Sequence, residues 1–441
     1  MRFHSLIFLV LVCMTLLNCR SNQGMPNVIL IMVDTLRADH LGVYGYHRQT
    51  SPNLDAFAAE NLVFLNHRSQ AACTFPSVNS LLTSRFATEF YGDFMGIPQE
   101  VPSLPTLLSA HGYRTAAISA SPIVQDQPTR FNPHGGFGNG FNEFLPNLAW
   151  APAESLFQKA VESMAGKNGG YFLYLHFIDP HGPYAPPENY NRRFAKPHDG
   201  PSFILEGKPN PIEAMLFSNG PAVEFSAEDI QHLIDLYDDE IAYFDHWFGR
   251  LLAHMKAQPW WEDAIVLVVS DHGEAFMEHN QIKHCRCLYD HQTATPLIMK
   301  VPKGSYRGSR ESLSQNLDVV PTVLELLKIA HPPDLFVGKS LVPIFEKEKE
   351  VTPYAFSAQS THRSINDAQH KLIVNLGSGA KEFFNLSLDP NEKLNLAQEN
   401  PREMEILASA LSQWMEQYHH EGDLEKAKAS QELLRSLGYI Q

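Results

Sequence analysis

Five long stretches of apolar residues, rich in β-branched side chains, recur between residues 27 and 302 of the chain. They are residues 27–34, 113–120, 171–179, 264–271 and 295–302. Apolar positions without alternation are typical of strands buried on both faces, as in a parallel central sheet. Helical patterns lie between them, such as 226–255, which begins at Ser226 with acidic residues in its first turn. Strands alternating with helices predict an α/β fold.

The pattern changes after about residue 350. Short alternating segments with Asn, Gly and Pro turns follow, up to about residue 400, and they predict a small antiparallel sheet. An amphipathic segment at 402–420 predicts a closing helix. We therefore predict a large α/β domain at 26–345 and a small C-terminal subdomain at 346–441, which ends in a polar tail.

The N-terminus has the features of an export signal. Residues 1–19 carry an Arg and an apolar run shorter than the roughly 20 residues that span a bilayer, so we predict a signal peptide, followed by a linker at 20–25. The sequence LLNC, ending at Cys19, resembles a bacterial lipoprotein processing box. A lipid on Cys19 would anchor an exported protein to a periplasmic or outer membrane surface. A secreted form and an uncleaved anchor are the alternatives.

The net charge of −15, without any basic run, argues against a nucleic-acid partner. It does not exclude an anionic substrate, because a bound metal ion can dominate the local charge. Outside the leader the chain has three cysteines, Cys73, Cys285 and Cys287. So few cysteines predict one disulfide bridge or none.

Carboxylates follow three of the predicted strands. Asp34, Asp179 and Asp271 stand at the ends of their apolar runs. Active sites of parallel sheets gather at the carboxyl ends of the strands, so we expect these side chains to meet. Any one of them alone is better explained by a helix cap or a turn, and it is the occurrence of three at strand ends that favours a shared site.

Histidines accompany two of these carboxylates. Asp271 and His272 are neighbours in SDHGE, and a carboxylate with an imidazole can hold one metal ion. Gly273 is expected to free the backbone for a turn. In IDPHGPYAPP, prolines stiffen the loop around His181, which could bind a substrate oxygen or protonate a leaving group.

Together these motifs resemble the sulfatase family of the alkaline phosphatase superfamily. The similar segments include NVILIMVDTLRADHLGVYGY, PSVNSLLTSR, YLHFIDPHGPYAPP, VVSDHGEAFMEHN and FFNLSLDPNEKLNLA, in family order between about residues 26 and 420. The resemblance makes 26–345 a sulfatase-type catalytic domain. It implies an alkaline-phosphatase-like fold, with a large, mostly parallel central sheet flanked by helices and a small C-terminal antiparallel sheet.

The resemblance also implies roles for single residues. The expected metal ligands are Asp34, Thr74, Asp271 and His272. His181 is expected to bind substrate, and His284 or its neighbour Lys283 is expected to contact the transferred group. Thr35 stands where many sulfatases have a further Asp. This favours a transition metal, so Mn or Zn compete with Ca as the divalent ion. A second metal on Asp179, His181 and His284 is a less favoured alternative.

The nucleophile is predicted to be Thr74. Typical sulfatases carry Cys-x-Pro-Ser-Arg, whose Cys becomes formylglycine, and Pro76 and Ser77 place Thr74 at that Cys position. Val78 replaces the Arg, so no formylglycine is expected. A metal and a helix N-terminus can activate a threonine hydroxyl toward an anionic ester.

Cys73 stands one residue before Thr74 and is expected to be a small buried apolar residue. A bridge from Cys73 to Cys285 or Cys287 is a further hypothesis, because both segments flank the expected site.

These inferences predict a metal-dependent hydrolase that cleaves phosphate, phosphonate or sulfate esters through a covalent Thr74 intermediate. His181 and His284 would bind substrate oxygens or protonate the leaving group. The substrate is expected to be an anionic ester on a small molecule, a glycan or a lipid head group. Two alternatives stay open: a phosphoryl-group transferase acting on envelope lipids or glycans, and an inactive surface-binding lipoprotein.

Overall fold

The computed structural model describes residues 24–90, 96–187, 190, 193–198, 225–347 and 349–418. The predicted signal peptide, the predicted lipidation of Cys19 and the predicted polar tail fall outside these residues. No helix in the described part of the chain is long and apolar enough to cross a membrane.

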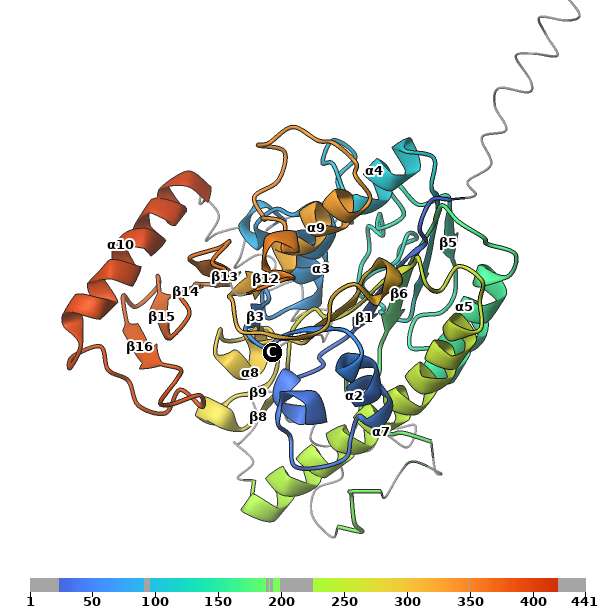
Figure 1. The fold of residues 1–441 in the computed structure, drawn as a ribbon. Helices are drawn as coiled ribbons and strands as arrows, with labels where there is room; N and C mark the ends of the chain where they lie inside the picture. Colours follow the sequence, from blue (N-terminus) through green and yellow to red (C-terminus); the bar gives the residue numbers. More distant parts are fainter. Residues whose placement is uncertain are drawn as a thin grey trace, which may run out of the picture.

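An eight-stranded sheet forms the centre of the molecule (Figure 1). In spatial order its strands are β11 (Gly308–Arg310), β2 (Leu62–Phe64), β10 (Leu297–Lys300), β7 (Ile265–Ser270), β1 (Val28–Val33), β6 (Tyr171–Phe177), β4 (Arg114–Ser119) and β5 (Glu143–Leu145). The five strands from β7 to β5 are parallel, and the fold class predicted from the sequence is confirmed.

Strand β10 departs from the expected parallel arrangement. It pairs antiparallel with β7 on one side and with β2 on the other. The chain between β7 and β10 forms the hairpin β8 (Ala275–Phe276) and β9 (Ile282–Lys283) and the short helix α8 (Asp290–Thr293). This connection contains no long crossover helix, so the chain returns in the opposite direction. An unbroken apolar run indicates that a strand is buried on both faces, but it does not indicate whether the strand is parallel or antiparallel to its neighbours.

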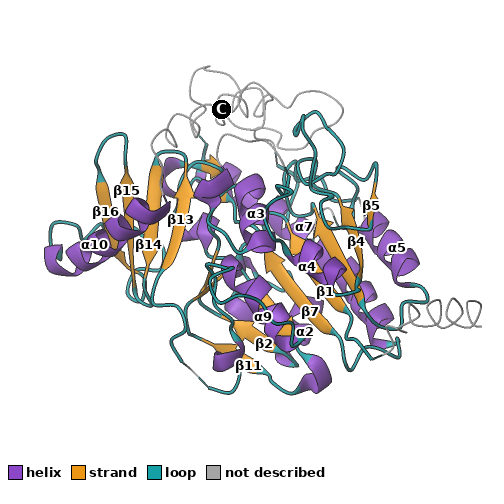
Figure 2. Ribbon diagram, turned by 90° about the horizontal axis from the view of Figure 1, so that it is seen from above, coloured by secondary structure: helices purple, strands orange, loops and turns teal. Residues whose placement is uncertain are grey.

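Helices cover both faces of the sheet (Figures 1 and 2). One face carries α2 (Pro52–Ala59), α5 (Ala153–Met164) and α7 (Ala227–Lys256), and the other carries α3 (Thr74–Thr83), α4 (Leu104–Ala110) and α9 (Val319–Leu326). Odd-numbered residues of β1 pack on the α7 side, and even-numbered ones pack on the α3 side. The predicted cap of α7 is present, since the Ser226 side chain accepts a hydrogen bond from the Asp229 N–H.

The C-terminal part is an antiparallel sheet covered by one helix. Its strands are β13 (Ala355–Gln359), β14 (His362–Asn366), β15 (His370–Asn375) and β16 (Lys381–Asn385), with α10 (Pro401–Tyr418) packed on them. Two short strands, β3 (His67–Arg68) and β12 (Ser314–Gln315), pair near this sheet. The Ser357 hydroxyl donates to the Ser69 carbonyl at 2.6 Å. The Ala358 N–H donates to the Gln70 carbonyl at 2.9 Å. The C-terminal sheet thus supports the segment that leads into α3.

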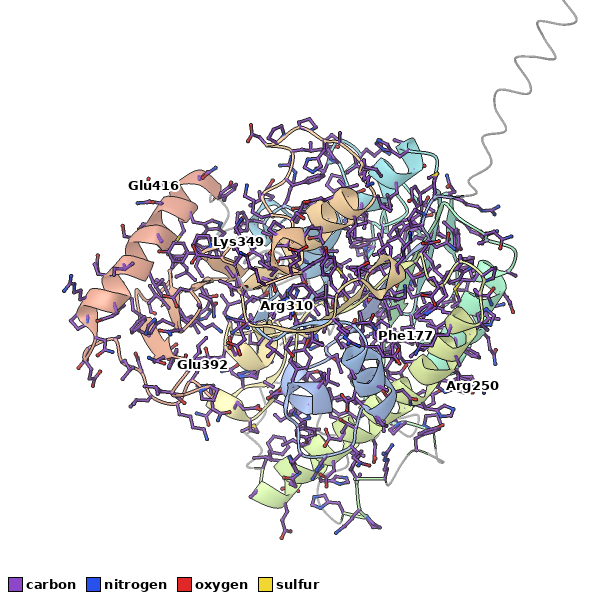
Figure 3. All side chains as sticks on the ribbon, in the orientation of Figure 1. Phe177, Arg250, Arg310, Lys349, Glu392 and Glu416 are labelled. Carbon is purple, nitrogen blue, oxygen red and sulfur yellow. A yellow bond between two sulfur atoms is a disulfide. The ribbon has the colours of Figure 1, made fainter. Side chains whose placement is uncertain are left out.

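A buried ionic cluster also joins the C-terminal sheet to the body. The Lys371 ammonium is fully buried and lies 2.7 Å from an Asp290 oxygen and 3.1 Å from a Glu392 oxygen. Glu392, labelled in Figure 3, lies at this junction and accepts from the Asp290 N–H. Arg68 contacts the second Asp290 oxygen at 2.9 Å. Two cations therefore balance one buried carboxylate, that of Glu392, and one partly buried carboxylate, that of Asp290.

We predict that Lys371→Met lowers the free energy of unfolding by about 3–5 kcal/mol, because it leaves buried carboxylates with too little positive charge. Urea unfolding measures the change. The matched control is Lys256→Met, since Lys256 also lies 2.7 Å from a carboxylate, that of Glu60, but at the surface. The control is expected to lose less than about 1 kcal/mol. An equal decrease in the free energy of unfolding in both variants would show that burial of the cluster does not increase its contribution to stability.

Candidate active site

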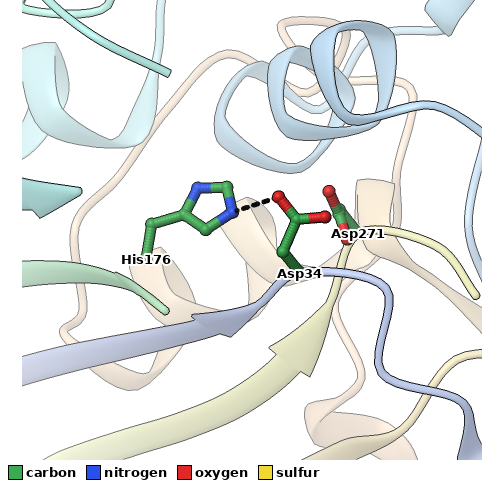
Figure 4. A group of neighbouring side chains, drawn as sticks. All are labelled: Asp34, His176 and Asp271. Atoms are coloured by element: carbon green, nitrogen blue, oxygen red, sulfur yellow. Dashed lines mark ion pairs between the residues drawn. The ribbon is translucent and has the colours of Figure 1, made fainter. Parts of the chain in front are cut away.

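Three adjacent strands deliver metal-binding side chains to one point (Figure 4). Asp34 follows β1, Asp271 follows β7, and His176 is the sixth residue of β6. His176 pairs with Met32 in the parallel register, and Met32 packs on the α3 side of the sheet. Because side chains alternate along a strand, Asp34 projects to that same side. One oxygen or nitrogen atom from each of the three residues lies within 4.8 Å of the others.

The three side chains are fully buried, and several of their polar atoms lack hydrogen-bond partners in the described part of the chain. Neither carboxylate oxygen of Asp34 has a hydrogen-bond partner among the described residues, nor does Asp271 Oδ2. His176 Nε2 lies 3.3 Å from Asp34 Oδ2, without hydrogen-bond geometry. Burial, together with the charge of Asp271, raises the pKa of Asp34 well above its ordinary value. Orphaned buried carboxylates that share one space are suited to a bound cation.

Backbone groups orient Asp271 and His272. The N–H groups of Thr35 and His272 donate to Asp271 Oδ1 at 3.1 and 2.8 Å, which leaves Oδ2 for another partner. His272 Nδ1 donates to the Gly273 carbonyl at 2.9 Å. The Nε2 lone pair of His272 therefore faces the site, 3.4 Å from Asp271 Oδ2 and 3.2 Å from the Thr74 hydroxyl.

Gly273 is required for space rather than for a turn. A Cβ atom at this position would lie 2.1 Å from the His291 carbonyl oxygen and 3.1 Å from Arg37 Cγ. The φ angle of Gly273 is not in the left-handed region. The expectation that this glycine frees the backbone is wrong, because any side chain would collide with the neighbouring segment.

Thr74 is the first residue of α3 and is fully buried. Its hydroxyl lies at the helix N-terminus, where unpaired N–H groups and the helix dipole favour negative charge. The Ser77 hydroxyl donates to the Asp271 carbonyl at 2.6 Å, which ties the first turn of α3 to the end of β7. Of the four expected metal ligands, Asp34 and Asp271 therefore gather with His176, and His272 and Thr74 adjoin them on the side of Asp271.

His284 lies beside this group and is held by a carboxylate. Its Nδ1 is 3.0 Å from a Glu274 oxygen, and the Tyr184 hydroxyl donates to the other Glu274 oxygen at 3.0 Å. Burial alone would raise the pKa of Glu274, but the charge of His284 and its hydrogen bond lower it to about 2. The His284 ring lies 4.6 Å from the His272 ring and 5.0 Å from that of His181. Its neighbour Lys283 is half-buried in β9.

His181 and Asp179 separate after β6. His181 Nδ1 donates to the Gly182 carbonyl at 2.5 Å, and burial lowers the pKa of His181 to about 3. Asp179 instead shares a hydrogen bond with Glu240 of α7, and burial raises its pKa to about 7. The expectation that Asp179 meets Asp34 and Asp271 is therefore wrong. Phe177 already packs on the α7 side, and the chain carries Asp179 toward that face.

Sequence reasoning missed two residues of this site. His176 takes the place expected for Asp179, and Glu274 orients His284. Within the described residues, Asp34, His176 and Asp271 are the only gathered group of three or more metal-binding side chains. The alternative of a second metal on Asp179, His181 and His284 therefore has no support in the described part of the chain.

A disulfide bridge joins two segments of the site. Cys73 is bonded to Cys285, and the buried Cys287 is free. Cys73 is buried among apolar side chains, as expected, and the hypothesis of a bridge across the site is confirmed. Thr74 follows Cys73, and His284 precedes Cys285. The bridge therefore fixes the backbone beside both of these side chains.

Comparison with protein families gives two matches. The model of the family described as Sulfatase matches residues 26–329. The model described as N-sulphoglucosamine sulphohydrolase, C-terminal, matches residues 278–421. The two matches together span nearly the whole described chain, including the C-terminal sheet and most of α10.

Similar proteins include enzymes named for different esters. The multifunctional alkaline phosphatase superfamily protein PehA of Trinickia caryophylli is 25% identical over 473 residues, covering 84% of this chain and 91% of that protein. An arylsulfatase of Clostridium perfringens is 22% identical, covering 84% and 90%. The phosphonate monoester hydrolase structure from Agrobacterium radiobacter superimposes with a TM-score of 0.72 at 21% identity, covering 89% and 96%. This likeness shows that the fold is alkaline-phosphatase-like.

We predict that replacing the bridge with Cys73→Ala/Cys285→Ala lowers the free energy of unfolding by about 2–4 kcal/mol. A looser attachment of Thr74 and His284 would also lower the turnover number. Thiol titration of the denatured, leader-free protein is expected to find one thiol before reduction and three afterwards. In Cys287→Ala the unreduced protein should show none. Three thiols before reduction would contradict the bridge, and a remaining thiol in Cys287→Ala would contradict this pairing.

Proposed function

The chain belongs to the sulfatase family of the alkaline phosphatase superfamily, and on that premise we propose that it hydrolyses phosphate or phosphonate esters through a covalent intermediate on Thr74. The ester-hydrolase class follows from the family. Membership of the family does not decide between phosphorus and sulfur esters, and it does not identify the nucleophile.

The position of Thr74 carries this proposal. Its hydroxyl lies 3.2 Å from His272 Nε2, at the N-terminus of α3 and beside the buried carboxylates. The nearest alternative nucleophile, Cys73, is held in a disulfide and cannot be the precursor of a formylglycine in this state. A formylglycine hydrate can release sulfate by collapse, whereas a sulfated threonine would need attack by water. This difference favours phosphorus esters.

The residues around Thr74 are suited to a divalent metal ion. Asp34, Asp271 and His272 would hold it together with the Thr74 oxygen, and the orphaned carboxylate oxygens support that assignment. Such an ion, for which Ca, Mn and Zn are candidates, would lower the pKa of the Thr74 hydroxyl and neutralise charge on the ester oxygens.

The reaction then takes two steps. The deprotonated Thr74 oxygen bonds to phosphorus as the bond from phosphorus to the leaving oxygen breaks, and the leaving oxygen takes a proton from His284. The proton that Thr74 loses passes to solvent. Water next attacks phosphorus and gives one proton to the now neutral His284, as the bond from phosphorus to the Thr74 oxygen breaks. Phosphate or phosphonate leaves, and the Thr74 oxygen takes a proton from solvent to restore the hydroxyl. Glu274 holds the His284 ring in place for this role, because its carboxylate lies 3.0 Å from Nδ1. His181 would contact a substrate oxygen.

We also propose that the enzyme acts outside the cytoplasm, anchored through a lipid on Cys19. The leader sequence supports export, and so does the buried Cys73–Cys285 bridge, because disulfides persist in oxidising compartments. The proposed substrate is an anionic ester on a small molecule, a glycan or a lipid head group at that surface.

A substrate screen tests the reaction. Leader-free protein, loaded with Ca, Mn or Zn, is expected to cleave 4-nitrophenyl phosphodiesters or phosphonates faster than 4-nitrophenyl sulfate. Thr74→Ala should reduce turnover by roughly 10³-fold or more, since the attacking oxygen is gone, and Thr74→Ser should retain part of the activity. Sulfate turnover that survives in Thr74→Ala would contradict the proposal. Transfer of the phosphoryl group to an added sugar or lipid acceptor would instead indicate a transferase.

The leaving group tests the role of His284. We expect His284→Asn to slow cleavage of alkyl esters by about 10²-fold, because an alkoxide needs a proton, and to slow 4-nitrophenyl esters by less than about tenfold. Steady-state turnover numbers measure both. His181→Asn is the matched control and should raise KM similarly for both leaving groups. Equal losses of turnover for both esters in His284→Asn would argue against proton donation by His284.

A further inference from the structure

We propose that His176 Nε2 is a direct ligand of the metal ion, beside Asp34 and Asp271, and that this imidazole makes the site selective for transition metals over calcium. The inference rests on the metal site of the proposed function, but not on which ester is cleaved.

The position of His176 in β6 carries the inference. Its side chain is fully buried, and its Nε2 lies 3.3 Å from Asp34 Oδ2 without hydrogen-bond geometry (Figure 4). The nearest ligand atoms of Asp34, His176 and Asp271 all lie within 4.8 Å. Ligands on opposite sides of a metal at about 2.1 Å stand roughly 4 Å apart. Only a small closure is therefore needed to place all three around one ion.

Tyr174 contacts the second nitrogen of the His176 ring, Nδ1. Its hydroxyl lies 2.9 Å from His176 Nδ1, two residues earlier on the same face of β6. When Nδ1 carries the proton and donates it to the hydroxyl oxygen, the Nε2 lone pair faces Asp34. A hydrogen bond to the second ring nitrogen is the usual support of a metal-binding histidine.

The donor set determines which ion fits. His176 and His272 would supply two imidazole nitrogens, and Asp34 and Asp271 would supply two carboxylates. Thr35 offers no third carboxylate: its backbone N–H is used on Asp271, and its hydroxyl has no recorded partner. Calcium prefers about 6–8 oxygen ligands, whereas imidazole suits zinc, iron and related ions. A site with two nitrogens and few oxygens should therefore discriminate against calcium.

A different role for His176 would be to orient Asp34 without touching the metal. In that case Nε2 would carry a proton and direct it at Asp34 Oδ2, and the ion would bind only one imidazole, that of His272. The two roles differ in the number of histidine rings around the ion, which X-ray absorption can count.

The test uses leader-free protein stripped with chelator and reloaded with one equivalent of Zn²⁺, without substrate. Zinc-edge X-ray absorption is expected to detect two imidazoles in the wild type and one in His176→Phe. The Zn²⁺ affinity of His176→Phe should fall by more than about 100-fold, with a much smaller change for Ca²⁺. The matched control, Tyr174→Phe, should lose about 10–100-fold in Zn²⁺ affinity yet keep both imidazoles.

One imidazole in the wild type, or no bound Zn²⁺, would overturn the inference, and this count does not depend on any variant folding. Equal losses of Ca²⁺ and Zn²⁺ affinity in His176→Phe would overturn the claimed selectivity. The test is independent of catalysis: a protein with two imidazoles but no phosphoesterase activity would support the metal site while contradicting the proposed ester.

Discussion

The active-site region depends on two buried carboxylates, Asp34 and Asp271, which the fold places close together without a Lys or Arg side chain, in the described part of the chain, to balance their charge. Asp34 and Asp271 follow neighbouring parallel strands in register, so their side chains emerge on the same face and close to each other. The sheet excludes water from both. No Lys or Arg ammonium or guanidinium forms an ion pair with either of them in the described residues. Like charges buried in this way repel, and a cation from solution relieves the repulsion most directly.

Several elements hold this strained arrangement in place. Thr35 adopts a left-handed backbone conformation with φ of 55°, which is unfavourable for a β-branched residue. Its N–H holds Asp271, and its carbonyl accepts from the Tyr237 hydroxyl at 2.7 Å. On the opposite side, the Cys73–Cys285 bridge and the C-terminal sheet hold the segment before α3. The C-terminal sheet is thus a support of the site as well as a separate layer of the fold.

The sequence predicted those parts of the site that a local pattern marks. Asp34 and Asp271 stand directly after long apolar runs, and Pro76 fixed the position of Thr74 within its motif. His176 was missed because a histidine inside an apolar strand is more often a satisfied core residue. Only the pairing of His176 with Met32 shows that it shares a face with Asp34. Strand order and register are long-range properties, and the same reason explains the errors over Asp179 and the direction of β10.

The proposed ligand position on β6 has a consequence for how the metal site can adapt to different ions. A metal ligand at position 35 would lie on the loop after β1, where small movements of the backbone can adjust the ligand to ions of different size. His176 instead lies within a strand that is paired on both sides, with β1 and β4, and its ring is held by Tyr174. A ligand in a close-packed strand has little freedom to move. With His176 as a ligand, metal preference would therefore be set by the most rigid part of the sheet, whereas His181 and His284, the proposed contacts of the ester, lie on loops that can differ among relatives that act on different esters.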